Sequence, residues 1–314
     1  MKPLRILMWH VHGSYLTALL EGPHTYVIPV LPDRSPDGRG RARTWNWPPN
    51  AVELTPEELR DTEVDLVVAQ RVHELELAER WLGRRPARDV AALYLEHTSP
   101  EGNIARMRHP VADRNDLLLV HVTHFNALFW DGGSTQTRVV EHGIVDPGYR
   151  YSGELPHAAV VVNEARRRGR LTGTDLLPHL NGDIRIDLFG MDAAALGGIE
   201  DLPQARLHDE IARRRVYLHP IRWTSLGLSL LEAMHLGMPV VALATTEVVE
   251  AVPREAGVVS NRLPVLREAL RKFVRDPDEA RARGRAARES ALERYGLARF
   301  LADWDRVFAE AVGH

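Results

Sequence analysis

Short apolar runs alternate with longer amphipathic stretches along most of the chain. In the first half these runs lie at 6–8, 26–31, 64–69, 90–95, 117–122 and 139–140. They are nearly continuous and do not alternate with polar residues, as expected for strands of a parallel sheet that helices cover on both faces. The pattern therefore predicts an α/β unit in the first half of the chain.

The same rhythm restarts in the second half. Apolar runs recur at 158–162, 184–189, 216–218, 240–244 and 257–259. Helical patterns are expected between them at 173–180, 203–215, 226–236 and 263–275. Two successive series of this kind predict two doubly wound, Rossmann-like domains. Gly143, Pro147 and Gly148 interrupt any regular element, which places the domain boundary near residue 150.

Three segments follow from this division: a domain over 1–150, a second domain over 151–295, and a helical end over 296–314. The last segment carries an apolar stripe at helical spacing, made of Phe300, Trp304, Val307 and Phe308. Such a stripe needs a partner surface. A final helix that packs back across both domains is one solution, and a homodimer through this helix is the alternative.

One stretch, 33–50, fits no regular element and predicts a long loop. Loops of this length are usually functional or disordered, and Trp45 and Trp47 argue against simple disorder. Two interpretations remain open. The tryptophans form a wall of a binding site, or they fold onto the domain surface.

Composition narrows the class of protein. The 314 residues are 44% apolar and 26% charged, as in ordinary soluble globular proteins. The net charge of −3 provides no general attraction to nucleic acid or anionic lipid, so we expect neither as a partner. The absence of cysteine excludes disulfides, cysteine nucleophiles and thiolate metal sites.

The chain shows no pattern of a secretory leader or a membrane span. The first apolar run is followed by His10 and His12, which come too early for the core of a leader. No window approaches the roughly 18 apolar residues of a transmembrane helix. We therefore expect a soluble, cytoplasmic protein.

In doubly wound sheets, ligands lie at the carboxyl ends of strands, so the loops that follow strands are candidates for a site. The first such loop contains His12, Gly13, Ser14 and Tyr15. Gly13 permits a close approach to the backbone, and Ser14 is a candidate cap of the following helix. A plain turn from strand to helix has the same pattern.

Histidines stand at two further strand ends. His97 follows the strand expected at 90–95, where its imidazole could donate to a substrate oxygen, although a structural histidine is the alternative. His121 and His124 are three residues apart, but no carboxylate or third histidine stands at a matching spacing. We therefore expect no metal site.

An arginine cluster follows the first strand of the second half. It consists of Arg166, Arg167, Arg168 and Arg170. Guanidinium groups at a strand end suit a diphosphate. A nucleic-acid patch is the rival interpretation, but no aromatic residues are interleaved and the chain is net acidic.

The most informative segment begins at the strand end His219-Pro220 and enters the helix expected at 226–236. Gly227, near the start of this helix, lets a diphosphate approach amides whose partial positive charge favours it. Glu232, deeper in the helix, is costly to bury unless it accepts hydrogen bonds. A ribose diol would donate two such bonds, and a buried arginine is the alternative partner.

Residues 225–241, SLGLSLLEAMHLGMPVV, resemble the donor-binding signature of the retaining GT-B glycosyltransferases of family 4. The resemblance implies a GT-B fold, in which two Rossmann-like domains face a central cleft. Glu232 matches the second glutamate of the family pattern, which holds the nucleotide ribose. Thr224 stands in place of the first glutamate, which faces the donor sugar.

The resemblance extends to the arginine cluster. Arg166 or Arg167 matches the family's arginine, whereas Thr172 replaces its lysine. Arg168 or Arg170 is then the candidate for the missing positive charge.

In the first domain, His97 resembles the histidine that approaches the donor sugar in mannosyltransferase-like members. Residues 140–146 resemble the turn between the domains of these enzymes, with His142 in place of an asparagine.

By resemblance, the chain transfers a sugar from a nucleotide diphosphate sugar to an unknown acceptor, with retention at the anomeric carbon and with no cofactor or metal ion. His97 and Thr224 would be catalytic, and His12, Ser14 and Tyr15 would lie on the acceptor side. The donor-binding residues would be Gly13, Arg166, Arg167, Arg170, Thr172, Ser225, Leu226, Gly227, Leu228 and Glu232. Two alternatives stay open: a nucleotide-sugar 2-epimerase of the same fold, and a non-catalytic nucleotide-sugar-binding protein.

Overall fold

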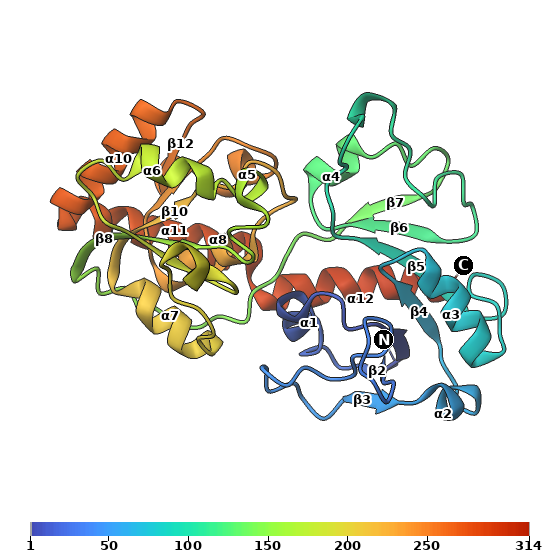
Figure 1. Ribbon diagram of the computed structural model, residues 1–314. Coiled ribbons are helices and arrows are strands. Elements are labelled where there is room, and N and C mark those ends of the chain that lie inside the picture. Colours follow the sequence, from blue (N-terminus) through green and yellow to red (C-terminus); the bar gives the residue numbers. More distant parts are fainter. Residues whose placement is uncertain (1, 314) are drawn as a thin grey trace. The chain divides into compact units, whose positions relative to one another are not determined.

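The chain forms two compact units in the computed structural model, which describes residues 2–313 (Figure 1). The first unit contains the residues up to Gly143 and those from Leu297 onward, and the second runs from Ile144 to Gly296. This division lies close to the boundary expected near residue 150. The final helix belongs to the first unit.

A parallel sheet forms the centre of the first unit. Over the described residues it has seven strands in the order β3-β2-β1-β4-β5-β6-β7. The strands are β1 (Arg5–Met8), β2 (Thr25–Pro29), β3 (Ala51–Leu54), β4 (Leu66–Ala69), β5 (Ala91–Glu96), β6 (Leu118–His121) and β7 (Thr137–Val139). Only β3 falls outside the predicted apolar runs, because it is a short edge strand that carries Glu53.

Helices cover both faces of this sheet. Its helices are α1 (Gly13–Leu19), α2 (Pro56–Arg60), α3 (His73–Leu82), α4 (His124–Phe129) and α12 (Leu297–Gly313), with the 3₁₀ turn η1 (Ile104–Arg106). Leu7, Val27 and Val67 point to the face that α2 and α3 cover. Alternate residues along each strand point to the other face, which α1 and α12 cover.

The apolar stripe of α12 is buried within the first unit. Phe300, Trp304 and Phe308 are each at most 1% exposed. The indole Nε1 of Trp304 donates to the Tyr15 hydroxyl at 3.0 Å. The partner surface of the stripe is therefore the first unit itself. A homodimer through this helix stays a prediction.

The second unit is built on a five-stranded parallel sheet in the described chain, in the order β12-β11-β10-β8-β9. The strands are β8 (Leu155–Val161), β9 (Ile186–Phe189), β10 (Arg214–His219), β11 (Val240–Ala242) and β12 (Gly257–Val259). Each overlaps a predicted apolar run. The predicted α/β class with doubly wound sheets is confirmed in both units.

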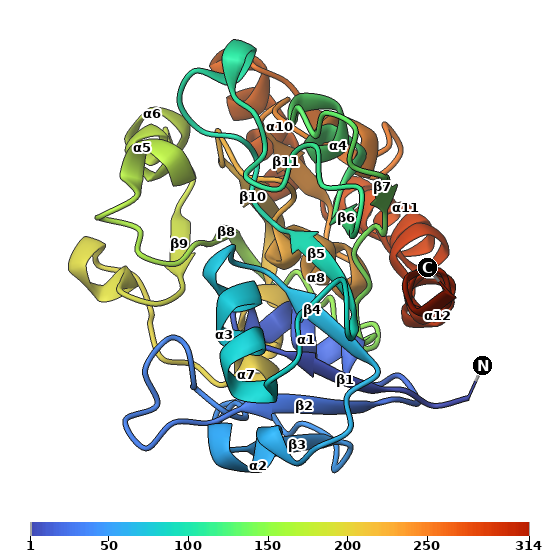
Figure 2. The same ribbon diagram turned by 90° about the vertical axis from the view of Figure 1, so that its right-hand side faces the viewer.

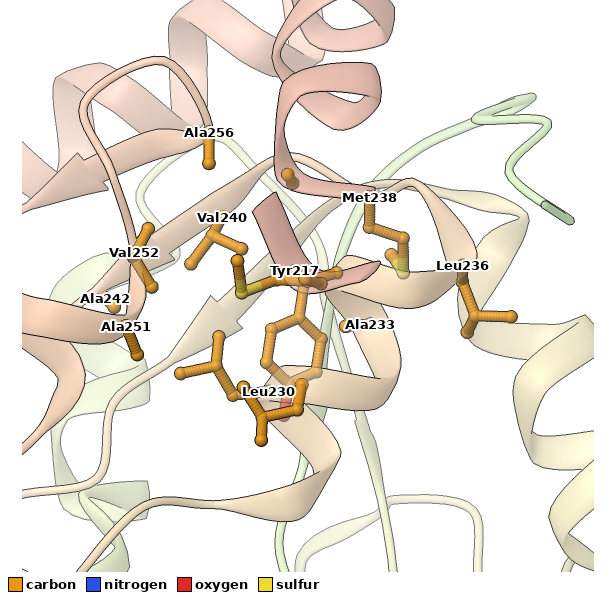
Figure 3. Packing of buried hydrophobic residues seen from close by; sticks show 14 of the residues in the cluster. Tyr217, Leu230, Ala233, Leu236, Met238, Val240, Ala242, Ala251, Val252 and Ala256 are labelled. Atoms are coloured by element: carbon orange, nitrogen blue, oxygen red, sulfur yellow. The ribbon is translucent and has the colours of Figure 1, made fainter. Parts of the chain in front are cut away.

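Two apolar layers enclose this second sheet. α8 and α11 pack on one face, around Tyr217, Leu230 and Ala233 (Figure 3), and α10 packs on the other through Leu266 and Phe273. The helices are α5 (Gly169–Thr172), α6 (Leu177–Leu180), α7 (Gln204–Ala212), α8 (Leu228–Leu236), α9 (Val248–Ala251), α10 (Leu263–Arg275) and α11 (Pro277–Tyr295), with the 3₁₀ turns η2 (Thr174–Leu176) and η3 (Ala193–Leu196). No helix in the described part of the chain is long and apolar enough to cross a bilayer.

Two predicted helices differ from the observed ones. The helix expected at 173–180 is broken into η2 and α6 beside the edge strand β9 (Figure 2), where Gly173 adopts a left-handed φ of +74°. The helix expected at 203–215 ends at Ala212 because Arg214 already belongs to β10. Arg214 is buried there in ion pairs with Asp187 and Glu210 at 2.9 and 2.7 Å, so an apolar pattern does not reveal the strand start.

The strand order reverses between β1 and β4 in the first unit and between β8 and β10 in the second. Ligands of doubly wound sheets bind beside such a reversal, at the carboxyl ends of the strands. The loops after β1, β4, β8 and β10 are therefore the places where a site is expected.

Candidate functional site

In the second unit, the candidate site is built on the start of α8. Gly227 is the N-cap of α8 and, being a glycine, supplies no side-chain cap. The first amides of α8 carry the partial positive charge of a helix start. Ser225 and Leu226 are buried in the preceding loop, and Thr224 is half-buried there. This end of α8 is suited to an anionic group.

The absence of a side chain at Gly227 leaves space for a buried neighbour, His219. A side-chain carbon at this position would lie 2.6 Å from Cε1 of His219. His219 is 1% exposed, and neither of its ring nitrogens has a hydrogen-bond partner within residues 2–313. Burial lowers the pKa of His219 to about 4, which keeps the ring neutral near pH 7. The structural reason for this glycine is therefore the space that it leaves for an imidazole.

Glu232 lies in the interior of α8 and is held by two residues of α7. Its Oε1 accepts a hydrogen bond from Nε2 of Gln204 at 2.9 Å, and Nε2 of His208 lies 3.3 Å from its Oε2. The arginine considered as its alternative partner is not there. A carboxylate oxygen can accept two hydrogen bonds, so one bond to each oxygen leaves capacity for a pair of hydroxyls.

The arginine cluster lies after β8 and is only partly paired. Arg167 forms an ion pair with Glu164, and Arg170 lies 3.8 Å from Asp175. Arg166 is exposed and forms no hydrogen bond or ion pair with the described residues. The Thr172 hydroxyl donates to the Arg168 carbonyl at 3.1 Å, so it is used inside its own helical turn.

Direct contacts join the arginine cluster to the loop before α8. Gly173 packs so closely on Pro220 that a side-chain carbon would lie 1.9 Å from the Pro220 carbonyl oxygen. The backbone amide of Arg222 donates to the Leu171 carbonyl at 2.9 Å, and the guanidinium group of Arg222 donates to the Asp175 carboxylate. The loops after β8 and β10, on either side of the strand reversal, thus form one continuous edge.

In the first unit, the loop after β1 leads directly into α1. His12 is the N-cap of α1 without a side-chain hydrogen bond, so the predicted capping role of Ser14 is wrong: Ser14 lies inside the helix. Gly13 is in contact with an indole, since a side-chain carbon there would lie 2.5 Å from Cζ3 of Trp45. Tyr15 is 2% exposed, and its hydroxyl faces α12.

His97 is held in one tautomer by Gln70. Nε2 of Gln70 donates to the Trp9 carbonyl at 2.8 Å, which directs Oε1 of Gln70 to Nε2 of His97 at 3.0 Å. His97 must therefore donate from Nε2, and its Nδ1 is an acceptor in the neutral ring. Burial and the neighbouring His12 and His142 keep the pKa of His97 well below its usual value. The one N–H of the ring is thus bonded to Gln70, whereas the sequence suggested donation to a substrate oxygen.

The structure brings His12, Tyr15 and His97 together. The ring centres of His12 and His97 are 4.3 Å apart, and those of Tyr15 and His97 are 4.6 Å apart. His142 lies 5.6 Å from Tyr15, is 4% exposed, and has no partner for either ring nitrogen in the described chain. Burial, with repulsion from His12 and Arg299, lowers its pKa to about 3.

Three polar residues of the site are missing from the prediction based on the sequence: Gln70, Gln204 and His208. Gln70 directly follows β4, so the rule of strand ends beside the reversal was a usable signal. No comparable signal marks Gln204 and His208, because they act from a neighbouring helix. No group of three or more histidine, aspartate or glutamate side chains in residues 2–313 is arranged to hold a metal ion.

The buried neutral histidines predict a loss of stability in mild acid. His121 and His219 are at most 1% exposed, and burial lowers the pKa of each to about 4. An unfolded histidine takes up its proton near pH 6.5, so below that pH the unfolded state binds more protons and the folded state loses stability. At pH 5 each of the two histidines should lower the free energy of unfolding by about 2 kcal/mol relative to pH 8. Thermal unfolding followed by circular dichroism between pH 8 and 5 measures this.

The glutamine variant His121→Gln should lose part of this acid sensitivity, whereas His179→Gln, at an exposed position, should keep it. A melting temperature that is constant between pH 8 and 5 would contradict the assignment of these rings as neutral.

A sequence family matches the region of α8. Residues 199–290 match the family described as Glycosyl transferases group 1. This segment includes Gln204, His208 and Glu232 as well as the start of α8. No curated protein matches the chain significantly.

Solved structures match nearly the whole chain. HepE from Anabaena in complex with UDP matches with a TM-score of 0.72 and 16% identity over 98% of this chain and 100% of its own. Sucrose-phosphate synthase from Thermosynechococcus elongatus matches with a TM-score of 0.70 and 16% identity over 98% of both chains. A glycosyltransferase from Rickettsia africae matches with a TM-score of 0.68 and 13% identity over 99% of both. The chain therefore has the fold of the GT-B glycosyltransferases and carries, at 199–290, the segment of the group 1 glycosyl transferase family.

Proposed function

We propose that this protein is a glycosyltransferase that moves a sugar from a nucleotide diphosphate sugar to an acceptor, with retention at the anomeric carbon and without a metal ion. The observation that carries the proposal is the combination of a glycine N-cap at the start of α8 with the buried carboxylate of Glu232, inside the segment that matches the family. HepE has been solved with UDP and with UDP-glucose, so UDP-sugars are the first donors to test.

The donor would lie along α8. The diphosphate binds the amides of Gly227 and Leu228, and the ribose hydroxyls donate to Glu232. Glu232 is four residues beyond Leu228, which is about 6 Å along the helix axis. This spacing is comparable to the span between the phosphates and the ribose hydroxyls of one nucleotide. Gln204 and His208 hold the carboxylate in place before the ribose arrives.

The leaving diphosphate gains negative charge as the bond to the sugar breaks. Amides at the start of α8 and the guanidinium groups of Arg166 and Arg170 would stabilise that charge, and this is the basis for proposing transfer without a metal ion. The departing phosphate then partners the oxocarbenium-like sugar, so a carboxylate at position 224 is not needed. Thr224 would contribute a neutral hydroxyl beside the sugar.

Loss of Arg166 should weaken donor binding selectively. Its guanidinium is exposed and unpaired in the described structure, so it can bind a phosphate without breaking an ion pair. Arg166→Ala should raise the donor dissociation constant by about 10- to 100-fold, the value of one charge-assisted hydrogen bond. Arg167→Ala should have a smaller effect, because Glu164 already binds that side chain. Titration calorimetry with UDP measures both.

The matched control is Arg285→Ala, since Arg285 is an exposed arginine of α11. Equal losses in Arg166→Ala and Arg285→Ala would show a general charge effect and would remove Arg166 from the site.

The proposed function can be tested by incubating the protein with radiolabelled UDP-sugars and a panel of acceptors, with and without EDTA. The quantity measured is the release of UDP. We expect slow hydrolysis without acceptor, faster release with a suitable acceptor, and no effect of EDTA. The anomeric configuration of the product, read by NMR, tests retention. Free epimerised sugar without acceptor would establish the epimerase instead, and binding without any release of UDP would establish a binding protein.

A further inference from the structure

The loop at 33–50 of the first unit is firmly anchored. Glu53 of β3 accepts hydrogen bonds from Arg34 at 3.0 Å and from the backbone amide of Arg41 at 2.6 Å. Nδ1 of His10 donates to the Gly40 carbonyl at 3.0 Å. These contacts fix the loop to the strand that leads into α1.

The two tryptophans of this loop have different surroundings. Trp47 is 3% exposed, and its Nε1 donates to Oγ1 of Thr17 at 3.0 Å, so it folds onto the domain. Trp45 is only half-buried, and Thr44 and Asn46 on either side of it are exposed. The anchoring of Trp47 thus holds the part of the loop that carries Trp45.

Trp45 lies at the carboxyl end of β1. Its benzene ring contacts Gly13, the first residue of α1, which lacks the side chain that would displace it. His12, adjacent in the chain, is exposed, and its ring is 4.3 Å from that of His97. An indole surface and an accessible imidazole therefore stand side by side at the strand end where this unit is expected to bind a ligand.

These groups suit an uncharged, hydroxylated ring. Burial lowers the pKa of His10 and His97, so both are neutral near pH 7, and the one N–H of each ring is already bonded, to the Gly40 carbonyl and to Gln70 respectively. Burial lowers the pKa of His12 as well, while the charges of Glu96 and Arg39 act on it in opposite directions. A neutral imidazole matches a hydroxyl better than an anion. The flat indole matches the apolar C–H face of a sugar ring.

We propose that Trp45 and His12 form an acceptor subsite for a sugar ring, which stacks on the indole while one of its hydroxyls bonds to His12. The proposal rests on the proposed glycosyl transfer and specifies its acceptor as a carbohydrate. It is a binding assignment, and no chemical step is attached to it.

Saturation-transfer NMR with methyl glycosides of glucose, galactose and mannose tests the subsite, with cyclohexanol and glycerol 3-phosphate as reference compounds. At least one glycoside should bind the wild-type protein. Trp45→Ala should weaken that binding by about five- to tenfold, the worth of one aromatic contact. Trp45→Phe, which keeps a flat ring and serves if the alanine variant does not fold, should lose less.

The matched control is Phe129→Ala, because Phe129 is an aromatic residue of the same unit that is 40% exposed. It should bind glycosides as the wild type does. Glycoside binding that is equal in Trp45→Ala and the wild type, or binding of glycerol 3-phosphate alone, would overturn the subsite.

A thermal shift with UDP, measured on the same samples, separates the two proposals. A shift with UDP but no glycoside signal overturns the subsite and leaves the donor site intact. Trp45-dependent glycoside binding without any shift by nucleotides supports the subsite and counts against the proposed function.

Discussion

Replacement of Glu232 by alanine should abolish detectable binding of nucleoside diphosphates. The carboxylate would accept two hydrogen bonds from the ribose hydroxyls, and hydrogen bonds to a charged acceptor are each worth about 1.5–3 kcal/mol, so the affinity should fall by about 100-fold or more. Stability should fall as well, because the change leaves the buried His208 without its partner. Titration calorimetry with UDP, and urea unfolding without ligand, measure the two effects separately.

The variant Glu232→Gln separates charge from shape. Its amide oxygen can still accept from His208, so stability should stay near that of the wild type, while binding of UDP should weaken by about tenfold. Glu289→Ala, at an exposed glutamate of α11, is the control and should leave both quantities unchanged. Wild-type affinity for UDP in Glu232→Ala would remove this residue from the donor site.

The second large effect is expected at Gly227. In Gly227→Ala the new methyl group would lie 2.6 Å from His219, whose ring is buried and cannot move away freely. Overpacking of this kind costs about 1–3 kcal/mol, and the shift of the α8 start should also weaken binding of UDP. Urea unfolding measures the loss of stability.

The double variant Gly227→Ala/His219→Ala tests the cause. With the imidazole removed, the added methyl group fits, so the loss in the double variant should be smaller than the sum of the two single losses by about 1 kcal/mol or more. Strictly additive losses would show that Gly227 is required for a reason other than the packing of His219.

The sequence predicts most of the sheet because its strands are buried on both faces and are apolar along their whole length. The helix expected at 263–275 is observed with the same ends as α10. The apolar pattern misses the parts of the two sheets that carry charged residues. Glu53 of β3 anchors a loop, and Arg214 of β10 is paired inside the core, so neither strand end has an apolar signature.

The site is predictable where one continuous segment forms it. The start of α8 and Glu232 can be found because strand, loop and helix follow each other directly. Gln204 and His208 could not be found, since their contact with Glu232 depends on how α7 packs against α8. For the same reason the sequence suggests Gly227 only for the close approach of a ligand and does not show that its missing side chain also makes room for His219.

Trp45 shows a third limit. The two tryptophans within 33–50 argue against a disordered loop. One interpretation, that they fold onto the domain, is observed for Trp47, and a binding role for Trp45 stays a proposal. Trp47 folds onto the domain and Trp45 lies at the candidate site. Two tryptophans that are nearly adjacent in sequence thus have different surroundings: Trp47 is hydrogen-bonded to Thr17, and Trp45 packs on Gly13.

The second unit should bind a nucleoside diphosphate through the start of α8 and Glu232. A thermal-shift panel of nucleoside diphosphates and nucleotide sugars tests it most directly, since a ligand at a hundred times its dissociation constant stabilises the folded protein by about 2.7 kcal/mol. We expect UDP and at least one UDP-sugar to raise the melting temperature of the wild type and to leave that of Glu232→Ala unchanged. No shift of the wild-type protein with any compound of the panel would contradict the account.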